Sequence, residues 1–175
     1  RIQSQAERPL LLPMEKKAAQ FVIELPDEDA CQNSLFRGTP YQERTISLNR
    51  LTFCHPSGLK GIRRGLPLMF YVNRVGAVGV GRVEDWYLDE PKNLYNTLDD
   101  MSYFDPEDVK EQAAASGPRA GRVLLIRFQW YKPFKRAVPL EEIRALDGSF
   151  NPQRARSLAR SLFRSVVAAG TPRDH

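Results

Sequence analysis

Histidine and cysteine are scarce in this chain, which limits the chemistry that its side chains can perform. Among 175 residues there are two histidines, His55 and His175, and two cysteines, Cys31 and Cys54. A zinc site needs three or four converging ligands, and the sequence contains neither a CxxC nor an HxxxH spacing. We therefore expect no metal site.

Other sites of catalysis or cofactor binding are also poorly supported. Cys54 and His55 are adjacent, and neighbouring side chains on a strand point apart, which suits neither a nucleophile nor its base. Gly76, Gly79 and Gly81 lack the lysine of a phosphate loop and the GxGxxG order. The valines between these glycines indicate a strand instead. We expect no cofactor.

Long hydrophobic runs are absent as well. No apolar stretch approaches the roughly 20 residues that cross a bilayer, and Pro13 interrupts the three leucines at 10–12. We therefore expect no membrane partner. Two cysteines are too few for a disulfide framework, which favours a reducing, cytoplasmic compartment. Because the first residue is Arg1 rather than methionine, we also expect a longer protein whose other part carries its own activity.

Charge is unevenly distributed along the chain. The net charge is +5, but residues 84–111 carry ten acidic side chains against two lysines, whereas residues 119–175 carry twelve arginines or lysines against four acids. A basic third of this kind can neutralise phosphates and supply sequence-independent affinity for nucleic acid. The alternative is an arginine-rich surface that only keeps the protein soluble.

Residues 65–90 carry the clearest structural signal. Two runs of β-forming residues, 68–72 and 77–83, flank a short polar tip. Glycines among the valines of the second run indicate a bulge or a close approach to the backbone. An acidic and aromatic cluster follows directly at 84–87. These features predict a small curved β-sheet with a pocket at one rim.

The other strands are predicted from alternating or continuous apolar runs. They cover residues 20–25, 45–53 and 123–130, with Pro133 ending the last strand or marking an edge. From 45 to 49 apolar and polar residues alternate, so this strand presents one polar face.

Helices are predicted at the margins of this sheet. Asp105 followed by Pro106 is typical of a helix start, another short helix spans 139–144, and a C-terminal amphipathic helix spans 152–169. Residues 89–104 are predicted to form a loop. The expected fold class is α+β, with about five or six strands in a small curved barrel and short flanking helices.

The domain boundaries follow from the same pattern. Residues 1–18 contain two prolines and little periodicity, so we expect an arm or linker there. A single domain over 19–170 and a tail over 171–175 complete the chain.

Aromatic and polar residues near the early strand predict a pocket for a nucleobase. Aromatic faces stack on bases at about 1–3 kcal/mol each, and asparagine offers a base edge both a donor and an acceptor. The predicted ligand-binding residues are Tyr41, Arg44, Ser47, Asn49, Arg50 and Trp86. The arginines predicted to contact the nucleic-acid backbone are Arg63, Arg64, Arg156, Arg160 and Arg164. The alternative is that many of the aromatic residues, including Trp130, serve packing only.

The order of these elements resembles the PUA-like superfamily, and within it the EVE and ASCH domains. The resemblance rests on Gly65, the strand end at 70–72, the glycine-rich run at 78–83, and the late order of strand, proline-led helix and final helix. Relatives of the EVE type are associated with flipping a modified base into a pocket, where stacking and edge hydrogen bonds offset the cost of flipping. The resemblance implies binding of RNA or DNA, with modified bases among the ligands, in a domain that is often fused to an effector or enzyme domain.

The ASCH signature, Gly-x-Lys-x-x-Glu-x-Arg, is only partly present. Residues 38–45 keep Gly38 and Glu43 at the matching offset, but Pro40 replaces the lysine and Arg44 stands one position early. Some ASCH-like proteins are thought to hydrolyse acylated cytidine with that lysine and glutamate. Since the lysine is missing here, the resemblance favours binding over hydrolysis.

Three functions follow as alternatives. The first is a nucleic-acid-binding module that is not itself an enzyme. The second is a small hydrolase of a modified nucleoside, with Glu43 as acid and base and Lys60 supplying the missing amine. The third is a regulatory domain whose acidic middle docks a basic protein partner.

Overall fold

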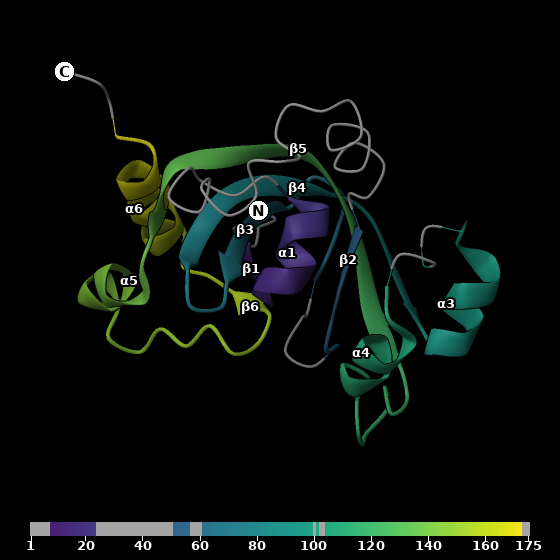
Figure 1. Cartoon of the computed structure of the whole chain (residues 1–175). Helices are drawn as coiled ribbons and strands as arrows, with labels where there is room; N and C mark the ends of the chain where they lie inside the picture. The colour runs from purple at the N-terminus through teal and green to yellow at the C-terminus, as the bar shows by residue number, and fades with distance from the viewer. Residues whose placement is uncertain (1–7, 24–50, 57–60, 100, 102–103, 173–175) are drawn as a thin grey trace, which may run out of the picture.

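A curled sheet of six strands forms the centre of the molecule, in the order β2-β5-β4-β3-β1-β6 (Figure 1). The computed structural model describes residues 8–23, 51–56, 61–99, 101 and 104–172. The strands are β1 (Leu10–Met14), β2 (Leu51–Cys54), β3 (Pro67–Val72), β4 (Gly76–Asp89), β5 (Val123–Val138) and β6 (Arg156–Ser157). The helices are α1 (Lys16–Val22), α3 (Pro91–Thr97), α4 (Pro106–Glu111), α5 (Leu140–Leu146) and α6 (Arg160–Gly170). The predicted α+β fold around a small curved sheet is confirmed.

Strands β3 and β4 form the predicted hairpin. Gly76 begins β4 with φ +122°, and a Cβ there would lie 2.2 Å from the carbonyl oxygen of Val138, so only glycine fits. The strand runs beyond the glycines and through the acidic and aromatic cluster as far as Asp89. Three register shifts between β4 and β5 mark bulges. Because bulges increase the local twist and bend a strand, they explain the curl of the sheet.

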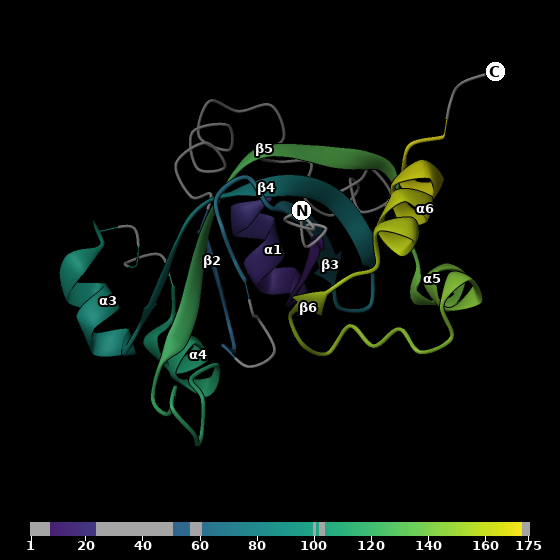
Figure 2. The ribbon, with the colours of Figure 1, turned by 180° about the vertical axis from the view of Figure 1, so that it is seen from behind.

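The inner, concave face of the sheet packs around α1 (Figures 1 and 2). Ala19, Val22 and Ile23 on or just after this helix are buried, and their spacing of three and four residues presents one apolar face. We call the buried set on this side the inner core. It comprises Leu10, Leu12, Met14, Ala19, Val22, Ile23, Cys54, Leu66, Leu68, Phe70, Val72, Val78, Val83, Leu124, Ile126, Phe128 and Ala155.

The outer face carries two pairs of helices, with α5 and α6 at one end and α3 and α4 at the other (Figures 1 and 2). Alternate residues of the same strands form the two outer clusters, such as Leu11 and Met69 under the first pair and Leu125 under the second. Gly170 of α6 packs so closely on Phe134 that a Cβ would lie 2.3 Å from the ring. None of the helices in the described ranges is long and apolar enough to cross a membrane.

The prediction of an arm or linker over residues 1–18 is wrong for the second half of this range. Leu10–Met14 is a buried strand between β3, to which it runs parallel, and β6. Pro9 and Pro13 led to the prediction of a linker. Strand β6 pairs with Leu10 and Leu11 and not with Pro13. Beyond that point no other described strand pairs with β1 on that side, and a proline such as Pro13 is tolerated at such an edge.

Two other segments have a different secondary structure from the predicted one. The predicted strand over 20–25 overlaps helix α1, because a short apolar run is compatible with either a helix or a strand. The predicted loop over 89–104 contains α3, which begins at Pro91 and is anchored by the buried side chain of Leu94. A proline at the first helical position is favourable, and this signal was overlooked.

The ends of two long elements also differ from the predictions. Strand β5 does not stop at Pro133 but continues to Val138, because Pro133 lies beside a register shift opposite Gly79. The predicted helix over 152–169 begins only at Arg160. Two of the residues before it, Arg156 and Ser157, form β6, and the amide of Leu158 donates to the carbonyl oxygen of Pro9 at 2.7 Å. The short helix predicted over 139–144 is confirmed as α5.

Candidate functional site

Trp86 lies where β4 leaves its hairpin partner. Strand β3 pairs with β4 only as far as Arg82, whereas Trp86 pairs with Ile126 of β5. A register shift separates Val83 from Asp85, and beyond it Trp86 packs against the inner core. Trp86 is half-buried, so part of its surface stays accessible to solvent. This position suits the predicted role in ligand binding, which itself stays a prediction.

Asp85 connects Trp86 to an arginine of the preceding loop. One carboxylate oxygen accepts a hydrogen bond from the backbone amide of Trp86 at 2.9 Å. The other accepts from the guanidinium of Arg64 at 3.2 Å. The Arg64 side chain is 74% exposed, so most of its donors face solvent. The predicted backbone-binding arginine and the predicted stacking residue therefore share one carboxylate.

The loop that carries Arg64 is fixed against β4. The amide of Gly65 donates to the carbonyl oxygen of Val83 at 2.8 Å, and the amide of Val83 donates to that of Leu66 at 3.0 Å. Arg82 adds a side-chain hydrogen bond of 2.9 Å to the carbonyl oxygen of Gly65. These contacts place Arg63, Arg64 and Arg82 on one rim of the sheet; all three are exposed.

Two members of this rim were not among the predicted site residues. Arg82 lay within a predicted strand, and Asp85 within the acidic and aromatic cluster that follows it. The bond between Arg64 and Asp85 joins residues 21 positions apart. Their proximity depends on the bulge after Val83, so no spacing rule would have paired them.

The three predicted backbone-contacting arginines near the C-terminus do not all lie on the helix predicted over 152–169. Arg160 and Arg164 lie four residues apart on α6 and are both exposed. Arg156 lies on β6 instead, where it pairs with Leu11 and is half-buried. The three arginines therefore do not form one helical stripe, because the helix begins after Arg156.

Most of the predicted pocket lies outside the described residues. The predicted ligand-binding residues outside them are Tyr41, Arg44, Ser47, Asn49 and Arg50. Glu43, the candidate acid and base, and Lys60, the candidate replacement for the lysine, also lie outside them. Their roles stay predictions.

Cys54 is a core thiol. It is 5% exposed in the inner core, and burial raises its pKa from 9.0 to about 12. A thiol with such a pKa is protonated at neutral pH and is a poor nucleophile. Within the described ranges, no three histidine, cysteine, aspartate or glutamate side chains are grouped as metal ligands.

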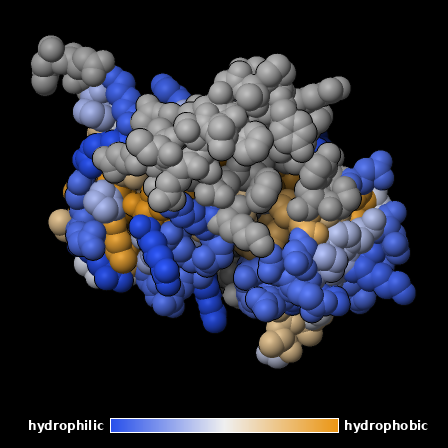
Figure 3. All heavy atoms as spheres, viewed as in Figure 1, coloured by the Kyte–Doolittle hydropathy of each residue, from blue (hydrophilic) through white to orange (hydrophobic). Residues whose placement is uncertain are grey.

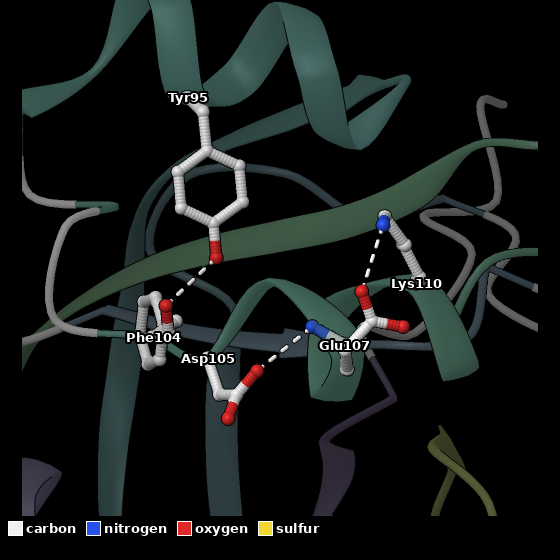
Figure 4. A network of polar contacts seen from close by, with 5 residues as sticks. All are labelled: Tyr95, Phe104, Asp105, Glu107 and Lys110. Carbon is white, nitrogen blue, oxygen red and sulfur yellow. Dashed lines mark hydrogen bonds and ion pairs between the residues drawn. The ribbon is translucent and has the colours of Figure 1, made fainter.

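Some acidic residues of the middle segment have structural roles (Figure 4). Asp105 accepts from the amide of Glu107 at 2.9 Å, which confirms the predicted start of α4. Glu107 accepts from the ammonium of Lys110 at 2.8 Å, and the hydroxyl of Tyr95 donates to the carbonyl oxygen of Phe104 at 2.9 Å. Burial, followed by the charge of Asp105, raises the pKa of Tyr95. The described surface over α3 and α4 is largely hydrophilic (Figure 3).

A curled sheet around one inner helix, with helices at both outer ends, is the PUA-like fold that the sequence resemblance implied. Solved structures with this fold include the ASCH protein of Zymomonas mobilis, with a TM-score of 0.61 and 10% identity over 93% of this chain and 95% of that chain. A serine-to-alanine variant of that protein gives a TM-score of 0.63 and 10% identity over 94% and 98% of the two chains. At this identity the likeness establishes the fold alone.

Sequence comparison adds no closer relationship. No protein-family model matches the chain, and no curated protein matches it either. The function therefore has to be argued from the site, since one fold supports many functions.

Proposed function

We propose that this chain is a nucleic-acid-binding module that holds one base on the concave side of its sheet, against Trp86. The observation that carries the proposal is the link between Trp86, Asp85 and Arg64, which brings an accessible aromatic side chain and an exposed guanidinium together at one rim. Single-stranded nucleic acids are bound by this combination, since bases stack on aromatic faces and cations contact phosphates.

The rim also provides charge for the backbone of the ligand. Arg63 and Arg82 are exposed beside Arg64 on the loop and strand that are hydrogen-bonded to each other. Guanidinium groups bind phosphate oxygens through paired donors. Arg156, Arg160 and Arg164 are assigned to a secondary basic surface. The same proposal includes a finer assignment. Tyr41, Ser47 and Asn49 would read a modified base, and Arg44 and Arg50 would contact the backbone.

The first test is binding of the full chain to labelled single-stranded RNA, single-stranded DNA and duplex DNA, measured by fluorescence anisotropy across a salt series. We expect a preference for one of them that persists at physiological salt, because counterion release alone weakens steeply with salt. Absence of binding to all three at low salt would refute the proposal.

The second test locates the base. Trp86→Leu keeps an apolar side chain against the inner core but removes the stacking face, and Asn49→Ala removes a predicted base-edge contact. Each should weaken binding by about tenfold or more. The matched control is Tyr87→Leu, because Tyr87 is the next aromatic residue on β4 and packs against the outer cluster. Equal affinity of all variants and the parent would show that the base lies elsewhere.

A further inference from the structure

Trp130 is both exposed and strained. The residue is 72% exposed, and its backbone φ of 57° lies in the left-handed region. For a bulky residue this conformation is a genuine outlier that costs roughly 1–2 kcal/mol. Glycine would adopt it freely. Backbone preference therefore does not account for a tryptophan here, and neither does packing.

The surrounding core keeps Trp130 in this conformation. Val80 pairs with Lys132 and Arg82 pairs with Gln129, so Trp130 and the next residue together oppose a single residue of β4. The extra residue turns Tyr131 into the inner core, where its ring centroid lies 5.4 Å from that of Phe70. The bulge thus serves packing through Tyr131 and leaves Trp130 directed away from the core. Strained residues that the structure fixes in this way are concentrated at binding sites.

The charges around Trp130 indicate the kind of ligand. Strand β5 contains four basic residues and no acidic one over Val123–Val138, and one of the four, Arg136, is paired with Glu142 of α5. Lys132 is exposed two residues after Trp130, and the exposed Arg82 lies opposite Gln129 on β4. A flat apolar face among cations is complementary to a nucleobase with its phosphates.

A broad protein interface fits less well. Among the described residues the large hydrophobic side chains that are exposed are Trp130 and Leu146, and Leu146 lies on α5. Protein interfaces instead present contiguous apolar patches of several hundred Å². An isolated aromatic face suits a ligand that stacks on one side chain.

We infer that Trp130 is a second stacking position, which binds a further unpaired base of the single-stranded nucleic acid whose first base is held at Trp86. The inference rests on the proposed function. Trp86 pairs with Ile126, and Trp130 lies four residues further along β5, at most about 13 Å at the usual rise of a strand, because the bulge shortens this stretch. Because Trp86 packs against the inner core and Trp130 is directed away from it, the two tryptophans contact separate, non-adjacent nucleotides of one strand, with Lys132 and Arg82 contacting phosphates beside Trp130.

The test uses the full chain and a labelled homopolymeric oligonucleotide of about twelve nucleotides. Anisotropy gives the affinity of the parent, Trp130→Ala and Trp130→Phe. We expect Trp130→Ala to bind about tenfold more weakly and Trp130→Phe to lose much less, because it retains an aromatic face. Leu146→Ala is the matched control, since it removes the other exposed apolar side chain, and its affinity should equal that of the parent.

Fluorescence assigns the contact to Trp130 itself. The chain has two tryptophans, so Trp86→Phe leaves Trp130 as the only one. Saturating oligonucleotide should quench its emission, whereas the same oligonucleotide with abasic sites should not. Lys132→Gln should lower the slope of log affinity against log salt by about one and leave base preference unchanged.

The possible outcomes separate the two proposals. If the parent binds no nucleic acid at low salt, the proposed function fails, and this inference fails with it. If the parent binds but Trp130→Ala binds equally well and the Trp130 emission does not change, only the second stacking position is refuted. A concentration-dependent dimer that Trp130→Ala abolishes, with unchanged nucleic-acid affinity, would refute it in favour of self-association.

Discussion

The two tryptophans lie on neighbouring strands but are supported in different ways. Trp86 occupies a regular strand position, pairs with Ile126 and packs against the inner core. Trp130 occupies a bulge with φ 57° and is 72% exposed. The fold alone accounts for much of Trp86, since a half-buried aromatic residue contributes to stability. It does not account for Trp130, whose side chain contributes little to packing.

This difference decides how each residue can be tested. Substitution of Trp86 changes stability and binding together, so its role in binding needs a control for folding. Substitution of Trp130 changes stability little, so an effect on binding can be attributed to the ligand. Exposed aromatic residues in strained conformations are therefore better evidence of a binding site than half-buried ones.

The largest effect is expected where the inner core under the bulge is disrupted. Phe70 is fully buried in the inner core, and its ring centroid lies 4.7 Å from that of Phe128 and 5.4 Å from that of Tyr131. Phe70→Ala should lower the free energy of unfolding by about 3–5 kcal/mol, because it leaves a cavity beside the bulge. Urea unfolding measures it, with Leu146→Ala as the exposed control. A loss below about 1 kcal/mol would contradict this account of the core.

Substituting each tryptophan in turn should separate the half-buried position from the strained one. Trp86→Ala should lower the free energy of unfolding by about 2 kcal/mol, since it removes half-buried apolar surface. Trp130→Gly should leave it unchanged or raise it by up to about 1 kcal/mol, because relief of the left-handed strain outweighs the entropy cost of glycine.

The control for this pair is Trp130→Val. A β-branched residue tolerates the left-handed region least, so this variant should be the least stable of those at position 130. Thermal or urea unfolding of the three proteins gives the order. If glycine were less stable than valine, Trp130 would not be strained.

Local signals were sufficient to predict the hairpin and the start of α4. Gly76 and the valines around it carry the turn and strand signals within a few residues, and the Asp105 cap acts over two residues. Strand β1 was missed because its partners are distant, with Leu10 pairing with Leu68 and Ser157. Its prolines suggested a linker, and only the short partner β6 explains why Pro13 is acceptable there.

The site shows the same division between local and distant contacts. Trp86 stood out by composition alone, but its link to Arg64 depends on a bulge and on a loop hydrogen-bonded to β4. The strain at Trp130 depends on how Tyr131 packs against Phe70. A linear pattern contains neither contact, because both arise from the register of β4 and β5.

A smaller, pH-dependent effect is expected on the Trp86 side of the sheet. Burial in the inner core raises the pKa of Cys54 from 9.0 to about 12. A group whose pKa is higher in the folded state stabilises that state fully below its unfolded pKa, and this stability is lost as the pH rises from about 9 towards 12. Between about pH 8 and pH 10 the parent should lose about 1 kcal/mol more free energy of unfolding than Cys54→Ala.

Urea unfolding of both proteins at the two pH values measures this difference. The raised pKa of Tyr71 adds to the pH dependence of both proteins equally, so it cancels in the comparison. Identical pH dependence would show that the thiol is accessible to water in the folded protein.

The smallest effect on stability is expected at the ion pair beside Trp86. The side chains of Arg64 and Asp85 are 74% and 33% exposed, and exposed pairs contribute little. Asp85→Asn should change the free energy of unfolding by less than about 0.5 kcal/mol, since the amide oxygen still accepts from the Trp86 amide. It should also tighten nucleic-acid binding by about twofold to threefold at low salt, because a negative charge next to Arg64 is removed. Glu107→Gln, which breaks the comparable pair with Lys110 on α4, should leave binding unchanged. Weaker binding by Asp85→Asn alone would show that the carboxylate positions Arg64 for the ligand rather than competing for it.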